Sequence, residues 1–212
     1  MTQTTARRVP LVATILVTLA VAAMIALGFW QLLDRLPRKE AFLAQLAANP
    51  AKPAMAFPRL PDETLLFRRA TGFCVQPTAI RLAGAGKAGF RAIADCRTGA
   101  EGPGMIVQLG TTRDPMARPA WAGGQVSGYI THAPDGRSLI GSLIDRTPPR
   151  LMLVADTPPA GLAPNGTPDI ASVPNNHLAY AGQWFFFAAI AAIIYVLALA
   201  RRGKVVSKAA SR

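Results

Sequence analysis

The chain has 212 residues, of which 51% are hydrophobic, and a formal net charge of +12. This length suits one ordinary domain with additional segments. The positive charge does not indicate a nucleic-acid-binding protein, because the surplus is concentrated near the two ends of the chain, where no acidic residue balances it. The excess in the intervening region is modest for its size. We therefore exclude nucleic acid as a partner.

Two apolar runs are long enough to cross a membrane. They extend over Val9–Trp30 and from about Leu178 to Ala200, and neither contains a charged residue. Each provides the roughly 20 apolar residues that a hydrocarbon core about 30 Å thick requires. A cleaved signal peptide is the alternative for the first run, but this run continues beyond a normal signal-peptide core. We predict two transmembrane helices.

The basic residues outside these runs predict the orientation of the chain in the membrane. By the positive-inside rule, both termini are cytoplasmic and the region between the two runs lies on the far side of the membrane. The basic C-terminal tail is expected to contact anionic lipid headgroups. The residues that carry this argument are Arg7, Arg8, Arg201, Arg202, Lys204, Lys208 and Arg212.

Between the apolar runs, the hydrophobic pattern changes from helical to strand-like. The first helix is expected to continue outside the membrane as far as Ala47, with Pro37 breaking or kinking it. A Pro- and Ala-rich linker follows at residues 49–61. Short apolar or alternating runs then predict strands. They are Leu65–Phe67, Phe73–Val75, Ala79–Leu82, Phe90–Ile93, Met105–Leu109, Gln125–Ile130, Ser138–Ile140 and Arg150–Val154.

The predicted fold class is membrane α+β, with two transmembrane helices flanking an exported, mostly antiparallel β domain that is barrel- or sandwich-like. Turn signals at residues 84–87 and 134–136 favour antiparallel neighbours. A closed barrel leaves no unpaired edge strand, and this favours the barrel over the sandwich. The predicted divisions are a cytoplasmic N-terminus at 1–8, the first transmembrane helix at 9–33, a juxtamembrane helix and linker at 34–61, the β domain at 62–156, a loop at 157–176, the second transmembrane helix at 177–200 and a basic cytoplasmic tail at 201–212.

Both cysteines, Cys74 and Cys96, lie in the region predicted to be exported. They lack C-x-x-C spacing, and no nearby histidine pair suggests zinc. An oxidising compartment permits a disulfide, and two buried thiols are the alternative. The sequence leaves both open, because it does not show whether the Cα atoms come within the roughly 4.4–6.8 Å that a bridge requires.

Catalytic motifs are scarce. The sequence contains no G-x-S-x-G nucleophile motif, no H-E-x-x-H, no P-loop and no G-x-G-x-x-G. Ser127, His132 and Asp135 are close in sequence and leave open a membrane-tethered hydrolase, although triads are recognised by geometry. The plainer interpretation of His132 is a surface residue before a hairpin turn.

The strongest candidate site lies where the second apolar run begins. Asn175 or Asn176 can cap this helix with a side-chain amide. The cap places His177 in the first turn, where the helix dipole disfavours the imidazolium form. Neutral histidine is the form that binds a metal. Tyr180 and Trp184 follow it on the same helix face.

Trp30 and Gln31 end the first helix at about the same depth as His177. Together with Tyr180 and Trp184, they would line a site in the outer leaflet that suits a porphyrin, with its iron held by His177. The alternative is an interfacial histidine beside ordinary aromatic belts. The residues by themselves leave these two interpretations open.

Two end motifs and two looser internal ones occur together in this chain. The second helix opens with Pro174-Asn175-Asn176-His177-Leu178-x-Tyr180-Ala181-x-x-Trp184-Phe185, and the first ends with Leu27-Gly28-x-Trp30-Gln31. The looser motifs are Met105-Ile106-Val107-Gln108-Leu109-Gly110 and Val126-Ser127-Gly128. With the two-span layout, these motifs closely resemble the surfeit locus protein 1 family of cytochrome c oxidase assembly factors. The chain departs from the family pattern at Asp34 and Leu109, where arginine is usual, and at Pro37, where tryptophan is usual.

The resemblance implies a non-enzymatic protein of the bacterial inner membrane, with both termini cytoplasmic and the central domain periplasmic. It implies transient binding of haem a and aid in its insertion into subunit I of cytochrome c oxidase, with haem a synthase as a further partner. His177 would be the axial metal ligand, and Trp30, Gln31, Tyr180 and Trp184 would shape the pocket. The alternatives are a haem-free scaffold that stabilises the nascent oxidase subunit and the membrane-tethered hydrolase.

Overall fold

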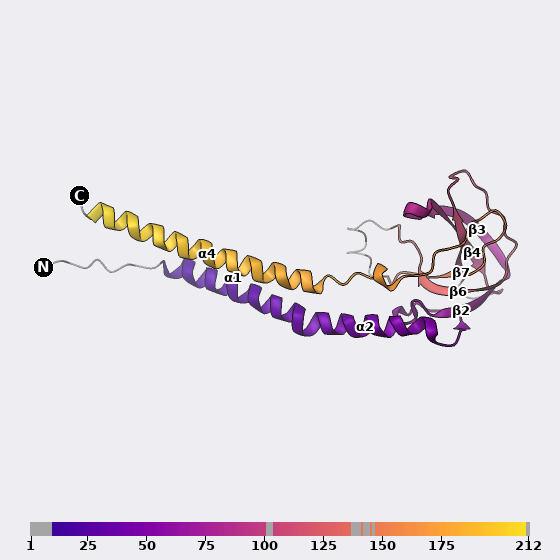
Figure 1. The fold of residues 1–212 in the computed structure, drawn as a ribbon, viewed down its shortest axis with the longest axis horizontal. Coiled ribbons are helices and arrows are strands. Elements are labelled where there is room, and N and C mark those ends of the chain that lie inside the picture. Colours follow the sequence, from indigo (N-terminus) through magenta and orange to yellow (C-terminus); the bar gives the residue numbers. More distant parts are fainter. Residues whose placement is uncertain (1–9, 101–103, 137–140, 142–144, 146, 211–212) are drawn as a thin grey trace. The chain divides into compact units, whose positions relative to one another are not determined.

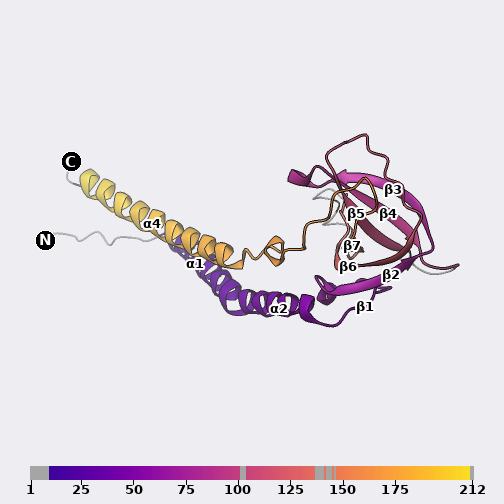
Figure 2. The ribbon, with the colours of Figure 1, turned by 45° about the vertical axis from the view of Figure 1, so that its right-hand side comes forward.

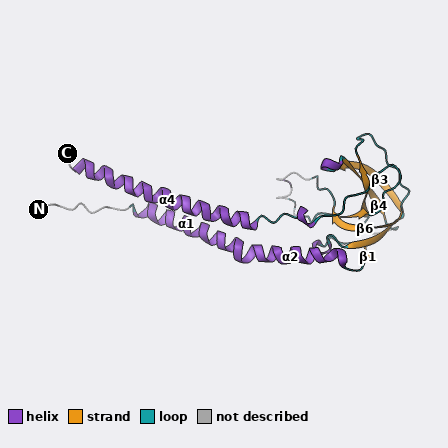
Figure 3. Ribbon diagram, viewed as in Figure 1, coloured by secondary structure: helices purple, strands orange, loops and turns teal. Residues whose placement is uncertain are grey.

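A computed structural model describes residues 10–100, 104–136, 141, 145 and 147–210 (Figure 1). The chain forms two compact units. The helical pair consists of Met1–Ala41 and Pro174–Arg212, and the sheet domain consists of Phe42–Val173. The predicted fold class is confirmed, because two long apolar helices flank a mixed seven-stranded sheet domain in the sequence (Figure 3).

The helical pair is built from α1 (Leu11–Trp30) and α4 (His177–Ala210), which lie side by side (Figures 1 and 2). The most apolar stretches of these two helical segments have a mean hydropathy of 2.5 and 2.2. Both segments are therefore long and apolar enough to cross a membrane. The second helix continues beyond its predicted end at residue 200 into the basic tail, as far as Ala210.

The α1–α4 seam, the set of side chains packed between these helices, follows a spacing of three and four residues along α1. This spacing is typical of helices that pack at a small crossing angle. Gly28 is a point of close approach, because a Cβ added there would lie 2.6 Å from Cε1 of Phe185. Phe29 and Phe185 pack edge to face, with ring centroids 5.3 Å apart. The more buried positions of α1 are Thr14, Val17, Val21, Met24 and Gly28, and Gln31 at the start of the following turn continues the spacing.

Substitution of Gly28 by valine is expected to loosen the helical pair by about 1–2 kcal/mol, because the Phe185 ring must move away from the added methyl groups. Spin labels at the exposed positions Ile15 and Leu197 would report the interhelical distance. We expect a longer or broader distance distribution than in the unsubstituted chain. The matched control is Gly182→Val, since nothing lies within 4 Å of a Cβ at Gly182. Equal distributions for both variants would contradict the packing role.

Pro37 does not end the first helix. The helix continues through the π turn η1 (Gln31–Arg35) into α2 (Leu36–Ala48). Proline lacks an N–H and its ring clashes with the carbonyl four residues earlier. The preceding turn widens instead, and the N–H of Leu36 donates to the carbonyl of Gln31, five residues back. The irregularity predicted at Pro37 is therefore a π turn on its N-terminal side.

The sheet domain contains one curved sheet of seven strands (Figure 2). The order across the sheet is β1-β2-β6-β7-β5-β4-β3. Neighbouring strands are antiparallel except for β1 with β2 and β5 with β7. The strands are β1 (Met55–Ala56), β2 (Arg69–Cys74), β3 (Gln76–Gly84), β4 (Phe90–Arg97), β5 (Met105–Thr112), β6 (Gly124–His132) and β7 (Leu151–Ala155).

The predicted strand at residues 65–67 is wrong. The 3₁₀ turn η3 (Glu63–Leu65) occupies the start of this segment, and Phe67 has a positive φ of 64°, which a strand does not accommodate. The apolar residues Leu66 and Phe67 instead lie in the core, with exposed fractions of 3% and 6%.

The predicted linker at residues 49–61 contains the 3₁₀ turn η2 (Asn49–Ala51) and the short strand β1. The predicted strand at residues 138–140 lies outside the described residues.

The central strands β4, β5 and β7 are buried on both faces of the sheet. Alternate residues such as Val107 and Leu153 join the main core. The intervening residues form a second cluster on the other face, consisting of Ile93, Ile106, Met152 and Val154. The loop after β7, which also carries the 3₁₀ turn η5 (Ile170–Ser172), crosses this region, where Thr111 exchanges two backbone hydrogen bonds with Ala163.

Cys74 and Cys96 form a disulfide, with their Cα atoms 5.4 Å apart. The bridge joins β2 to β4, although β6, β7 and β5 lie between these strands in the sheet order. Strands so far apart in a flat sheet would not meet, because neighbouring strands are about 4.8 Å apart. The curvature of the sheet brings them together, which favours the barrel-like alternative over a sandwich of two sheets.

Candidate functional site

His177 and Gln31 meet where α1 ends and α4 begins. Nδ1 of His177 lies 2.8 Å from Oε1 of Gln31, although the residues are 146 positions apart in the sequence. Both residues are partly buried. The amide oxygen can only accept, so the Nδ1–H of the imidazole donates this hydrogen bond. In the neutral form of the ring, this arrangement leaves the lone pair on Nε2 of His177.

The start of α4 places His177. The N–H of Tyr180 donates to the carbonyl of Asn176 at 2.9 Å, which is the first hydrogen bond of the helix. Of the two predicted capping side chains, Asn175 does not cap, because its Oδ1 atom is buried and lacks a hydrogen-bond partner among the described residues. His177 is therefore the first residue of the helix, and the first turn contains no acidic residue.

The predicted aromatic residues of the site are less enclosed than the His177–Gln31 contact. Trp30 and Tyr180 are 42% and 48% exposed, and Trp184 is partly buried. The structure thus brings Gln31 and His177 together and leaves Trp30 and Tyr180 largely on the helix surface. These rings present flat apolar faces to whatever surrounds the helical pair.

Sequence reasoning missed a cation–π contact beside the site. The guanidinium carbon of Arg35 lies 4.5 Å from the centroid of the Trp30 ring. In a regular α-helix, residues five apart point in different directions, but a π turn brings them closer to alignment. The signal in the sequence is Pro37, which predicts a break or kink but does not specify a π turn. Asp34, at the position where the family usually has arginine, forms a salt bridge of 2.6 Å with Arg38.

The donor atoms at this junction suit a metal that arrives within a larger group. Among the described residues, no group of three or more His, Cys, Asp and Glu side chains is placed to hold a metal ion. A bare ion such as zinc needs three or four protein ligands. A porphyrin supplies four ligands to its iron and needs only an axial histidine from the protein. One imidazole with a free Nε2 lone pair therefore fits a haem.

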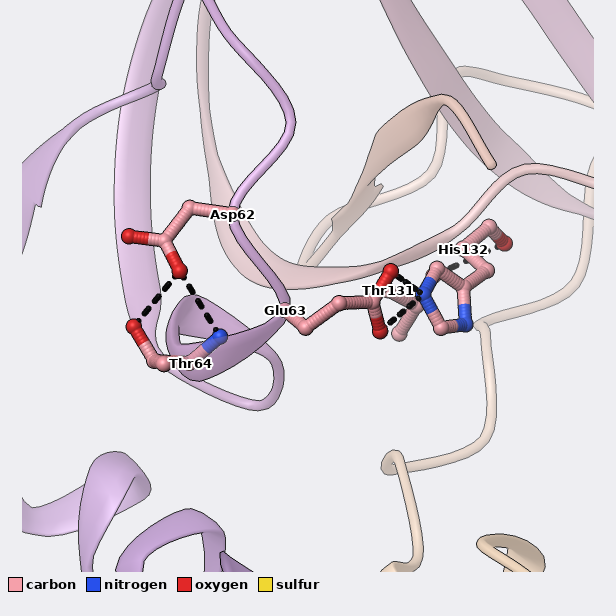
Figure 4. A network of polar contacts seen from close by, with 5 residues as sticks. All are labelled: Asp62, Glu63, Thr64, Thr131 and His132. Carbon is pink, nitrogen blue, oxygen red and sulfur yellow. Dashed lines mark hydrogen bonds and ion pairs between the residues drawn. The ribbon is translucent and has the colours of Figure 1, made fainter. Parts of the chain in front are cut away.

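The second histidine of the chain, His132, lies in the sheet domain and is paired with a carboxylate. Its Nε2 atom lies 2.8 and 2.9 Å from the two carboxylate oxygens of Glu63, in an exposed position (Figure 4). Nearby, hydrogen bonds from the hydroxyl and the backbone N–H of Thr64 lower the pKa of Asp62 (Figure 4). The Glu63–His132 contact ties η3 to the end of β6, while the Asp62–Thr64 hydrogen bonds cap η3.

The proposed triad of Ser127, His132 and Asp135 does not form around this histidine. Ser127 and His132 are five positions apart on β6, whose pairing with β7 is regular from residue 128 to residue 132. Residues an odd number apart on a strand point to opposite faces of the sheet, and five residues span about 16 Å. Ser127 is therefore not a nucleophile within reach of His132, and His132 is a surface residue as the plainer interpretation expected.

The fold and the junction define a membrane protein with two spanning helices, an intervening mixed sheet domain and one histidine at the start of the second helix. The model of the SURF1 family matches residues 18–189, well over half of the chain. The chain belongs to the SURF1 family, which is a family of cytochrome oxidase assembly factors. The predicted family is thus confirmed. No curated protein matches the chain.

Proposed function

We propose that this protein holds haem a transiently and aids its insertion into subunit I of cytochrome c oxidase. The observation that carries the proposal is the hydrogen bond between His177 and Gln31 at the junction of the two helices. It occupies one ring nitrogen of the partly buried His177 and leaves the other nitrogen free of this hydrogen bond. Bound haem would supply the iron centre that the oxidase requires, and His177 would hold it.

The residues around His177 suit a carrier that must release its cargo. A single protein ligand holds the iron less firmly than two would. Trp30 and Tyr180 are large, partly exposed rings that can cover an apolar macrocycle without enclosing it. Trp184 follows on the same helix. The aromatic residues therefore contribute contact area to the bound haem, while the imidazole contributes the coordinate bond.

The sheet domain is placed in the bacterial periplasm by this proposal, with both termini in the cytoplasm. The disulfide between Cys74 and Cys96 supports this orientation, because such bonds persist in oxidising compartments and are rare in the cytosol. The basic residues outside the two spans support it as well. Subunit I of the oxidase and haem a synthase are the proposed protein partners, and anionic lipid is the proposed contact of the basic tail.

The test is purification of the protein from cells that make haem a. We expect the unsubstituted chain to carry a haem with a Soret band, and the His177→Ala variant to lose most of the haem and to change the spectrum of the remainder. The matched control is His132→Ala, because the chain has only 2 histidines. This variant should retain the full haem load.

Two outcomes would contradict the haem proposal. Equal haem load and spectrum in the unsubstituted chain and His177→Ala would exclude His177 as the ligand. Copurification of oxidase subunit I without Soret absorbance would favour the alternative role, a haem-free scaffold that stabilises the nascent subunit. The partly exposed rings at the helix ends would then contact protein and not haem.

A further inference from the structure

Gln31 differs from the other side chains of the junction because it contacts the ring of His177 directly. Its amide oxygen accepts from Nδ1 at 2.8 Å. A neutral imidazole carries its single proton on one of two nitrogens, and the hydrogen bond made by one nitrogen decides which. An acceptor fixed at Nδ1 therefore selects the form with the proton on Nδ1 and the lone pair on Nε2.

Without Gln31, the Nδ1–H tautomer of His177 would not be the preferred one. Neutral histidine in water favours the proton on Nε2, which blocks that nitrogen as a ligand. A histidine that binds a metal almost always donates its other ring N–H to a carboxylate or carbonyl oxygen, and loss of this partner weakens metal binding by about 10–100-fold. The amide of Gln31 is in the position that such a partner occupies.

The local backbone explains how Gln31 reaches the ring. Gln31 directly follows α1, continues the spacing of the α1–α4 seam and is the first residue of the π turn η1 (Gln31–Arg35). Its carbonyl accepts from Leu36 in the wide turn that precedes Pro37. Gly28, one turn earlier, allows the backbone of α1 to approach Phe185 on α4. Close approach at Gly28 and the widened turn after it together set the Gln31 side chain against His177.

We infer that Gln31 is a positioning residue, which holds His177 in the Nδ1–H tautomer and so presents Nε2 as the atom that binds the haem iron. The inference rests on the proposed function for the identity of the cargo. The tautomer itself is a property of the haem-free chain. Gln31 acts through the imidazole and does not touch the iron.

The haem-free, full-length protein in lipid bicelles provides the direct test. Histidine labelled with ¹⁵N in the ring gives signals from 2 residues, and His132→Asn assigns them. We expect the neutral ring of His177 to carry its proton on Nδ1. Gln31→Leu should shift the ring towards the Nε2–H form, whereas Gln31→Glu, which keeps an acceptor oxygen, should preserve the Nδ1–H form. Gln183→Leu, an exposed glutamine on α4, is the matched control.

A haem titration of the same variants gives the second measurement. We expect Gln31→Leu to weaken haem binding by about 10–100-fold and to alter the electron paramagnetic resonance signature of the ferric haem. Gln31→Glu should keep binding near that of the unsubstituted chain, with a lower reduction potential, because a stronger acceptor makes the ligand more electron-rich. If Gln31 had only a structural role, its substitution would change stability. Haem binding would then not depend on whether residue 31 keeps an acceptor oxygen, as it does in Gln31→Glu but not in Gln31→Leu.

The outcomes separate the inference from the proposed function. A His177 ring with its proton on Nε2 in the unsubstituted chain would overturn the inference, whether or not haem binds. The same holds if Gln31→Leu leaves the tautomer and the haem spectrum unchanged. An Nδ1–H tautomer that depends on Gln31, in a chain that binds no haem, would overturn the proposed function and leave the assignment of Gln31 standing.

Discussion

Gly128→Ala is expected to destabilise the sheet domain by about 3 kcal/mol. Gly128 lies on β6 between β2 and β7, opposite Ala70 on one side and Ala155 on the other. An added Cβ would overlap the carbonyl oxygen of Val154 and lie 2.7 Å from its carbonyl carbon and 3.2 Å from Cα of Ala155. These are backbone atoms of a paired strand, so they cannot turn away as a side chain can. The β6–β7 pairing must open to admit the methyl group.

Urea unfolding of the full-length protein in micelles, followed by circular dichroism, would measure this effect. With a urea dependence of about 1–3 kcal/mol per molar for a small domain, the midpoint should fall by about 1–3 M. The control is Gly84→Ala on β3, where a Cβ meets nothing within 4 Å. That variant should change stability by less than about 0.5 kcal/mol. Similar midpoints for both variants would show that the strands separate more easily than the close contact implies.

Removal of the disulfide by a Cys74→Ala/Cys96→Ala double substitution is expected to cost a similar amount, about 3 kcal/mol. The cysteines are 22 positions apart, so the bridge closes a loop of the unfolded chain and lowers its conformational entropy. In the folded domain, the bridge connects β2 and β4 across the curve of the sheet. Its loss also removes a covalent link between strands that have no ladder of hydrogen bonds between them.

Unfolding with and without a reducing agent isolates the contribution of the bridge. The reductant should lower the urea midpoint of the unsubstituted protein and leave that of the double variant unchanged. Thiol labelling would confirm that Cys74 and Cys96 are free after reduction. An unchanged midpoint in protein with two labelled thiols would contradict the expected stabilisation.

Local patterns predicted the helices and most strands because those elements depend on residues close in sequence. Uncharged apolar runs indicated both membrane-length helices, and alternation indicated strands such as β5 and β6. The prediction of a strand at residues 65–67 failed because three consecutive apolar residues suit a strand and the buried end of a 3₁₀ turn equally well. The order of the strands and the parallel β5–β7 pair depend on contacts between distant segments, which no local pattern records.

The candidate site was predictable as a set of residues but not as a set of contacts. His177 was singled out by its place at the start of a helix, and Gln31 by its place at the end of another. Which atoms meet depends on how the two helices align, and on the π turn that Pro37 imposes. The cap expected from Asn175 or Asn176 illustrates the difficulty, since the oxygen of Asn175 has the right chemistry but is buried without a hydrogen-bond partner among the described residues.

Two hydrogen bonds that join α1 and the adjoining η1 to α4 have a consequence for the alignment of these helices. Thr14 bonds to Tyr195 at 2.5 Å near one end of the seam, and Gln31 bonds to His177 at the other end. The 17 residues from Thr14 to Gln31 span about 26 Å. A slide of one helix by a single turn, about 5.4 Å, would break both bonds. Thr14 would keep its hydrogen bond to the carbonyl of Pro10 at 3.0 Å, but Tyr195, Gln31 and His177 would lose these partners in or near lipid. The two bonds together thus fix the register of the two helices. The Thr14–Tyr195 bond near one end of the seam helps to set the position of His177 along the helix axis at the other end.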